Sequence, residues 1–229
     1  MAPEPPASLL AAQAYARLRA DILNNRLMPG TPLSVPALAA RLDMSRSPVR
    51  EAVQRLIHDG LATQVAHRGA AVARIDPAEL DDLYVVKEPL EGLATRLATP
   101  RLTLDGERRL RRMVEEHERL LESGAPESAH VQMDLDLHRY IREVAGNAAL
   151  TATLERFEGK TNLAFPTLWS DPEASRLAVE EHRAIVEAMI AGDPGGAERA
   201  ARDHVERIRL RWARRMVTAY RRPESAAGA

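Results

Sequence analysis

The feature that most constrains this chain is the stretch from Ser45 to Leu61, which reads SRSPVREAVQRLIHDGL. Ser47 followed by Pro48 predicts a helix N-cap and a first helical residue, because a serine hydroxyl can accept from the free N–H groups there and proline has no N–H to satisfy. Gly60 predicts the end of the same helix. The stretch therefore predicts one short helix with polar and basic residues at its beginning.

Apolar residues on both sides of this helix complete a small domain. A helical period over Leu9–Leu27 predicts a first helix, and Ser34 is positioned to cap a second helix over Pro36–Leu42. The third helix is predicted over Ser45–Asp59. Two short apolar segments, Ala62–Val65 and Ala70–Ala73, follow and predict a hairpin. Three helices and a hairpin predict a winged helix-turn-helix domain over residues 1–75.

From Pro77 onward the apolar residues recur with the period of a helix. The predicted helices are Pro77–Ala98, Leu104–Ser123, Glu127–Ala145, Ala148–Trp169, Pro172–Ala191 and Gly195–Tyr220. They predict an all-helical antiparallel bundle over residues 76–221, followed by a disordered tail over residues 222–229. The expected fold class is mainly α, with a winged helix-turn-helix before a helical bundle.

Charge is distributed unevenly between the two predicted domains. Residues 1–74 contain nine Arg and five Asp or Glu, a balance of about +4, whereas the rest of the chain contains 23 Lys or Arg and 28 Asp or Glu. A basic first domain is consistent with a nucleic-acid partner. The chain has no cysteine, no apolar run long enough to span a bilayer and no signal-peptide pattern, so we expect a cytoplasmic protein without a membrane partner.

The predicted third helix carries the candidates for contact with double-stranded DNA. Arg46 and Arg50 lie at its N-terminal end, where a helix-turn-helix domain meets the major groove and where arginine can bind guanine through two hydrogen bonds. Ser45 and Ser47 suit phosphate oxygens. Arg55 is expected to be solvated or paired with a carboxylate one turn away, at Glu51.

The tip of the predicted hairpin adds three candidates. His67 and Arg68 can enter the minor groove or contact phosphate, and Gly69 allows a tight turn.

Four residues of the second domain form a candidate metal site. Asp134 and His138 are four residues apart and project from one face of a helix, and His182 and His204 lie on apolar stripes of two later helices. One carboxylate and three neutral imidazoles suit zinc or nickel. The alternative is that each histidine is buried and hydrogen-bonded without a metal. His117 and His130 are expected at the surface, outside the site.

Short motifs along most of the chain resemble one family of bacterial regulators. In the first domain they are Leu27-Met28-Pro29-Gly30, Ser45-Arg46-Ser47-Pro48-Val49-Arg50-Glu51-Ala52, Asp59-Gly60-Leu61 and Arg68-Gly69. These resemble the DNA-binding half of GntR-type regulators. In the second domain Asp134-x-x-x-His138, Glu181-His182, Gly192-Asp193 and His204 resemble the FCD ligand domain of the FadR-like branch. The chain departs from the family at Pro36, Lys87 and Leu137, where a charged residue, Arg and Phe are usual.

The resemblance implies a transcription regulator, expected to be a repressor, that is not an enzyme. It implies a small organic acid effector held on a divalent metal, with Lys87, Arg96, Arg142 and Asn162 as candidate effector contacts. A palindromic operator would be bound by a homodimer, because two recognition helices read two half-sites. Two alternatives remain at this stage: a metal-dependent enzyme that uses the Asp and His residues, and a sensor for which the metal itself is the signal.

Overall fold

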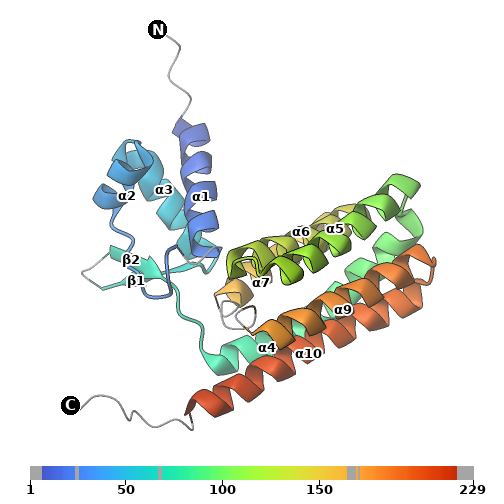
Figure 1. Ribbon diagram of the computed structural model, residues 1–229. Helices are drawn as coiled ribbons and strands as arrows, with labels where there is room; N and C mark the ends of the chain where they lie inside the picture. Colours follow the sequence, from blue (N-terminus) through green and yellow to red (C-terminus); the bar gives the residue numbers. More distant parts are fainter. Residues whose placement is uncertain (1–6, 24–25, 67–68, 164–168, 170, 221–229) are drawn as a thin grey trace. The chain divides into compact units, whose positions relative to one another are not determined.

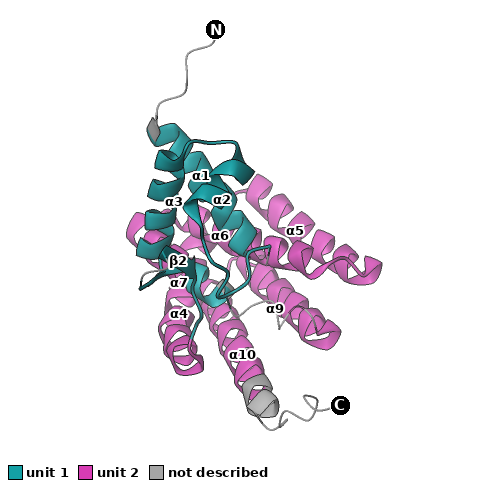
Figure 2. Ribbon diagram, turned by 90° about the vertical axis from the view of Figure 1, so that its left-hand side faces the viewer, with its two compact units in different colours: residues 1–75, 158–164 teal, residues 76–157, 165–229 magenta. Residues whose placement is uncertain are grey.

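The computed structural model describes residues 7–23, 26–66, 69–163, 169 and 171–220. The chain divides into two compact units, one of residues 1–75 with 158–164 and the other of residues 76–157 with 165–229 (Figure 2). The sequence predicts residues 158–164 as part of the second domain. They group with the first unit because Leu163 packs in its hydrophobic core and Glu158 lies 3.4 Å from Arg19.

Among its described residues, the first unit contains three complete helices, the end of a fourth and a two-stranded antiparallel sheet (Figure 1). Its elements are α1 (Ala7–Leu23), α2 (Val35–Leu42), α3 (Arg46–His58), β1 (Ala62–Val65) and β2 (Gly69–Val72). Helix α1 packs against α3, and Ala62 lies opposite Val72 in the sheet. Leu18, Val49 and Leu56 are completely buried in the core between these elements. This is the winged helix-turn-helix arrangement.

Three predicted boundaries in this unit are wrong. Helix α1 ends at Leu23 rather than Leu27, and the N–H of Leu27 instead donates to the carbonyl of Asp21. The N-cap of α3 is Ser45, whose backbone is extended, so Ser47 and Pro48 lie in the first turn. Proline is tolerated there because the first N–H groups of a helix have no partner within it. Strand β2 begins one residue early, at Gly69, which adopts a φ of 85°.

The described residues of the second unit form helices joined by short links, with no strand among them. Its elements are α4 (Pro77–Ala98), the short 3-10 helix η1 (Thr99–Arg101), α5 (Leu104–Ser123), α6 (Glu127–Ala145), α7 (Ala148–Asn162), α9 (Pro172–Ile190) and α10 (Pro194–Tyr220). Of α7, residues 148–157 belong to this unit. Side chains cap several of these helices, as Asp76 does for α4 and Thr103 for α5. Helix α7 ends at Asn162 and does not continue to Trp169 as predicted.

Packing within the second unit brings four helices around one point. Helix α4 lies against α10 and α6, and α9 lies against α10 and α5. Leu110, Ile141, Ile185 and Met189 form the centre of the apolar core. Buried polar residues of α4, α6, α9 and α10 lie next to this core and form the candidate site. No described helix combines the length and the apolar character needed to cross a bilayer.

Candidate metal centre and DNA-reading helix

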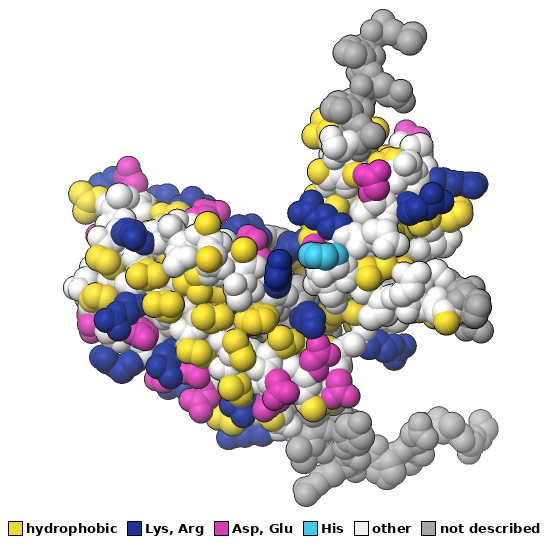
Figure 3. Space-filling model, turned by 180° about the vertical axis from the view of Figure 1, so that it is seen from behind, with side chains coloured by type: hydrophobic (Ala, Val, Ile, Leu, Met, Phe, Trp, Pro, Cys, Tyr) yellow, Lys and Arg dark blue, Asp and Glu magenta, His cyan; other side chains and the backbone are white. Residues whose placement is uncertain are grey.

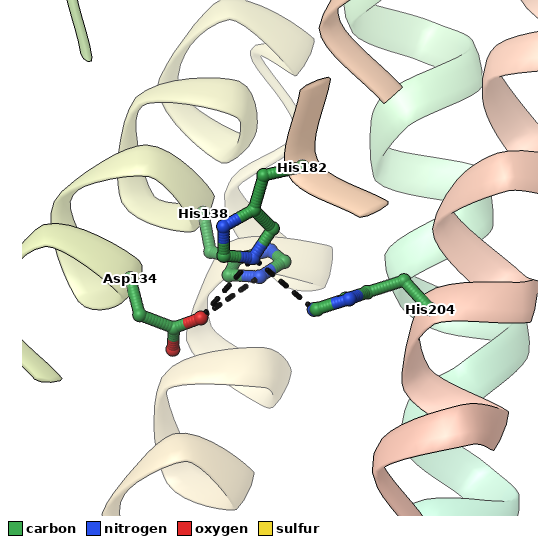
Figure 4. A group of neighbouring side chains, drawn as sticks. All are labelled: Asp134, His138, His182 and His204. Atoms are coloured by element: carbon green, nitrogen blue, oxygen red, sulfur yellow. Dashed lines mark hydrogen bonds and ion pairs between the residues drawn. The ribbon is translucent and has the colours of Figure 1, made fainter. Parts of the chain in front are cut away.

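One carboxylate and three imidazoles meet inside the helical unit (Figure 4). Asp134 and His138 come from successive turns of α6, His182 comes from α9 and His204 from α10. Each residue is at most 7% exposed. One ligand atom from each lies within 4.8 Å of the corresponding atoms of the other three. This group is of the size and composition that can hold one divalent ion.

The atoms that face one another are all potential ligands. His182 Nε2 lies 3.2 Å from Asp134 Oδ1 and 3.2 Å from His204 Nε2, and His138 Nε2 lies 3.7 Å from Asp134 Oδ1. Despite these short distances, Asp134 Oδ1 is buried without a well-formed hydrogen bond to a described residue. Three imidazole nitrogens and a carboxylate oxygen that face one another fit a cation between them better than a hydrogen-bonded core.

A second layer of charged side chains faces two of the three rings. Glu181 Oε2 accepts a hydrogen bond from His204 Nδ1 at 2.8 Å, and Arg211 donates to both oxygens of Glu181 at 2.8 Å. Glu91 Oε2 faces His138 Nδ1 at 3.7 Å, beyond hydrogen-bonding distance. A carboxylate that accepts from Nδ1, as Glu181 does, selects the tautomer that directs Nε2 toward a metal.

Glu91 is in turn held between two cations. Arg142 donates to Glu91 Oε1 at 3.2 Å, and the Lys87 ammonium lies 3.8 Å from the same oxygen. All three side chains are at most 8% exposed. The arrangement places two positive charges around one negative charge beside His138.

The electrostatics keep these groups in the protonation states that metal binding needs. Burial favours the neutral form of Asp134, but its contacts with His182, His138 and His204 outweigh burial, so the pKa of this carboxyl is lowered. Burial also opposes ionisation of Glu181, but the hydrogen bonds from Arg211 and His204 lower its pKa to about 2. Burial lowers the pKa of His182, and it lowers that of His204 to about 3 with the help of His182. Carboxylates and neutral imidazoles are the forms that bind divalent ions.

The prediction that His117 and His130 lie at the surface is wrong. They are 2% and 5% exposed, and the His117 ring centroid lies 5.9 Å from that of His182. The sequence contained a signal for both. His117 continues the apolar stripe of Leu110 and Val114 on α5, and His130 lies one helical turn before Asp134 on α6.

The four candidate effector contacts are separated by the structure. Lys87 and Arg142 are buried beside Glu91, next to the metal-ligand group. Arg96 is exposed on α4 and pairs with Glu198 at 3.0 Å, so it does not belong to the site. The side chain of Asn162 lies outside the described part of the structure.

Helix α3 exposes its N-terminal polar residues and buries its apolar side. Ser45, Arg46, Ser47 and Arg50 are all exposed, whereas Val49, Ala52, Val53 and Leu56 face the core. A helix anchored in this way presents its first two turns to a partner. In the wing, Gly69 begins β2, and His67 and Arg68 lie outside the described residues.

Arg55 has a structural role at the other end of α3. Its guanidinium lies 4.1 Å from the centre of the Tyr15 ring and 3.9 Å from Asp59. The Arg55 side chain is 59% exposed, as the expected solvated side chain would be, and its carboxylate partner one turn away is Asp59 rather than the alternative Glu51. Tyr15 also donates to Asp59 at 2.6 Å. These contacts tie α1 to the end of α3.

Comparisons with known proteins match each of the two units to a protein family. Residues 10–72 match the model of bacterial regulatory proteins of the gntR family, and residues 82–207 match that of the FCD domain. A probable D-xylose utilization operon transcriptional repressor of Paenarthrobacter nicotinovorans is 32% identical over 86% of this chain and 85% of its own length. The repressor RspR of Escherichia coli is 24% identical over 86% of each chain.

Solved structures share the fold. Escherichia coli McbR/YncC superposes with a TM-score of 0.82 at 22% identity, covering 90% of this chain and 98% of its own. A GntR-type regulator from Rhodococcus sp. RHA1 gives a TM-score of 0.73 at 20% identity, covering 89% and 97%. The matched domains and relatives are those of transcription regulators and not of enzymes. The chain is therefore a DNA-binding transcriptional regulator of the GntR family, in which a winged helix-turn-helix domain is followed along the sequence by a helical FCD domain.

Proposed function

We propose that this regulator is a repressor that binds a palindromic operator as a homodimer and responds to a small organic acid held at a divalent metal. The observation that carries the proposal is the buried group of Asp134, His138, His182 and His204, whose ligand atoms converge within 4.8 Å. Its one oxygen and three nitrogen ligands suit zinc or nickel. Because four protein ligands need not fill the coordination sphere, the metal can also bind an effector carboxylate.

The charge balance of the site favours an anionic effector. The carboxylates of Glu91, Asp134 and Glu181 lie among four cations, the buried Lys87 and Arg142 and, beside Glu181, Arg211 and the more exposed Arg207. These side chains carry no excess of negative charge while the histidines are neutral. A divalent ion adds two positive charges, and an excess buried charge is costly unless an opposite charge accompanies it. An organic acid supplies that charge, and a dianion supplies all of it.

Lys87 and Arg142 are the side chains best placed to support the acid. Both are buried, and both contact the carboxylate of Glu91. The carboxylate of an effector beside them would be stabilised by both positive charges. Arg142 can present its planar guanidinium to a carboxylate, and Lys87 acts as a point charge.

DNA recognition is assigned to the exposed start of α3 and to the wing. Arg46 and Arg50 would read guanine in the major groove, with Ser45 and Ser47 on phosphate oxygens. His67, Arg68 and Gly69 of the wing would contact the minor groove or its phosphates.

The outer face of α4 and α10 is our candidate for the homodimer interface. Val85, Val86 and Leu93 of α4 and Leu210 of α10 are 38–49% exposed, and α4 lies against α10. Hydrophobic side chains also lie side by side on the face of the helical unit seen in Figure 3. A second copy could bury the same stripe through a two-fold axis.

Titration of one DNA complex tests this function. The full-length protein is mixed with labelled DNA from upstream of its own gene, and anisotropy is followed while zinc, nickel and a panel of organic acids are added separately and together. We expect an acid to change the DNA affinity only when metal is present. Release by metal alone would make the metal the signal. An affinity unaffected by every combination would contradict the proposed regulation.

A further inference from the structure

A second cluster of buried polar rings adjoins the metal-ligand group. His117 of α5, His130 of α6 and Trp169 are 2%, 5% and 6% exposed. The His117 ring centroid lies 5.4 Å from that of His130 and 5.1 Å from that of Trp169, and the His130 and Trp169 rings are stacked at 5.8 Å. The proposed metal ligands do not include any of these three residues.

Polar atoms of this cluster are buried and lack a hydrogen-bond partner among the residues that the structure describes. They are His117 Nε2, His130 Nδ1 and Trp169 Nε1, together with Nδ1 of the adjacent His182. Folded proteins pair the large majority of such atoms, because an unpaired buried polar group is destabilising. Four such unpaired atoms on neighbouring rings indicate that a polar ligand, which the isolated chain lacks, forms hydrogen bonds with them.

The three histidines of the metal group differ in what faces their Nδ1 atoms. Nδ1 of His204 donates to Glu181 and Nδ1 of His138 faces Glu91 at 3.7 Å, whereas Nδ1 of His182 is buried without a hydrogen-bond partner among the described residues. His182 is also the metal-ligand candidate that adjoins His117, with ring centroids 5.9 Å apart. The unpaired nitrogens of the cluster therefore continue from the His182 ring of the metal group.

The cluster offers neutral groups of both hydrogen-bonding kinds. Trp169 Nε1 can only donate. A neutral imidazole has one nitrogen that donates and one that accepts, so His117 and His130 can supply either kind of group at their unpaired atoms.

We propose that His117, His130 and Trp169 form a sub-site that binds hydroxyl groups of the acid whose carboxylate is held at the metal group. A hydroxyl both donates and accepts, so it can satisfy the donor Trp169 Nε1 and an imidazole nitrogen in either of its two forms. A carboxylate only accepts, so it cannot satisfy an imidazole nitrogen that carries a lone pair. The inference rests on the proposed function and adds to it a chemical class of effector, the hydroxylated carboxylic acids.

Calorimetric titration with matched acids tests the sub-site. Zinc-loaded full-length protein is titrated with galactarate and adipate, which share a six-carbon dicarboxylate chain and differ only in hydroxyl groups, and with tartrate and succinate as the shorter pair. We expect the hydroxylated member of at least one pair to bind about tenfold more tightly, as one to two hydrogen bonds would give. Equal affinities within both pairs would overturn the proposal.

Substitutions then assign the preference to the cluster. His117→Phe and Trp169→Phe keep a buried aromatic ring and remove the unpaired nitrogen. We therefore expect each variant to bind galactarate and adipate about equally, while its affinities for adipate and zinc stay unchanged. Trp212→Phe, which changes another buried tryptophan on α10, is the matched control and should keep the preference. If His117→Phe does not fold, Trp169→Phe and His130→Phe decide the question.

The failures of the two proposals are distinguishable. If neither adipate nor galactarate binds the zinc-loaded protein, the metal-held acid itself is wrong and the sub-site falls with it. If both bind, and His117→Phe and Trp169→Phe keep the full hydroxyl preference, the acid site stands and the sub-site is overturned. A nitrogen-15 NMR shift of the His117 ring on addition of galactarate, absent with adipate, would support the sub-site independently of affinity.

Discussion

Glu181 accepts a hydrogen bond from Nδ1 of His204 at 2.8 Å inside the helical unit. Because the carboxylate accepts, the proton of the neutral imidazole stays on Nδ1 and the lone pair of Nε2 is directed toward His182 and Asp134. Arg211 holds the carboxylate through both oxygens. Glu181 of α9, which directly precedes the proposed ligand His182, thus sets the orientation of the proposed ligand His204 on α10.

Glu181→Gln should weaken zinc binding by about 10–100-fold, the usual effect of losing such a partner. The amide can donate to Nδ1 and so favours the wrong tautomer, and it loses the ionic contact with Arg211. Zinc affinity is measured by competition with a chromophoric chelator. Glu180→Gln is the control, because Glu180 is exposed and pairs only with Arg176 among the described residues. Equal zinc affinity for both variants would contradict the prediction.

Removal of metal should lower thermal stability. A ligand that binds only the folded state stabilises it by about 2.7 kcal/mol at a hundred times its dissociation constant, so zinc should raise the melting temperature of chelator-treated protein by several degrees. Asp134→Asn removes the carboxylate charge with little change in size and should abolish most of the zinc-dependent rise. Calorimetry with and without zinc measures both. A full zinc response in this variant would remove Asp134 from the ligand set.

Acid should destabilise the metal-free protein from about pH 6.5 downward. The pKa values of His117 and His204 are lowered to about 3 in the folded state, so the unfolded chain binds more protons than the folded one between pH 3 and 6.5. Stability is therefore greatest above pH 6.5 and is lost as the pH falls, by about 1.4 kcal/mol per pH unit for each such histidine.

Urea unfolding of metal-free protein at several pH values measures this slope. The lowered pKa values of Glu91 and Glu181 act in the same direction, but only near and below pH 4.5. His117→Phe should therefore reduce the slope between pH 6.5 and 5. A stability that is constant from pH 7 to 5 would show that these histidines titrate normally.

The fold was predictable because its signals are local. Helical periods, Pro–Gly breaks and a cap such as Ser34 predict most helix ends to within a residue. The exceptions have local causes as well: Ser45 takes the N-cap because Pro48 is tolerated inside the first turn. The four metal-ligand candidates could be selected because Asp134 and His138 have a helical spacing that one ion can bridge.

The rest of the site could not be predicted because it depends on which helices become neighbours. Nothing in the sequence near Arg142 shows that Glu91, 51 residues away, is its partner. The contact between the rings of His117 and Trp169 could not be predicted either, since α5 is a strongly charged helix whose apolar stripe is narrow. A histidine on such a stripe is ambiguous until the facing helix is known.

Arg50→Ala should abolish specific operator binding without changing the melting temperature. Arg50 is exposed on α3 and its loss removes a base contact worth about 1–3 kcal/mol in each half-site. Operator affinity should fall at least about 30-fold toward the affinity for unrelated DNA, measured by anisotropy at fixed salt. Arg55→Ala is the control on the same helix. Because Arg55 contacts Tyr15 and Asp59, it should lose some stability and retain operator selectivity.

Val86→Asp should dissociate the homodimer if the exposed stripe of α4 is buried against a second copy. A carboxylate in the middle of a symmetric apolar interface is buried twice, once from each copy, and neither charge has an opposite partner there. Light scattering after gel filtration should show monomers at micromolar concentration, and operator affinity should fall because only one recognition helix is then presented to two half-sites. Leu104→Asp is the control, since Leu104 is 71% exposed at the start of α5, away from the α4 stripe. Val86→Asp protein that remains a dimer with full operator affinity would place the interface elsewhere on the helical unit.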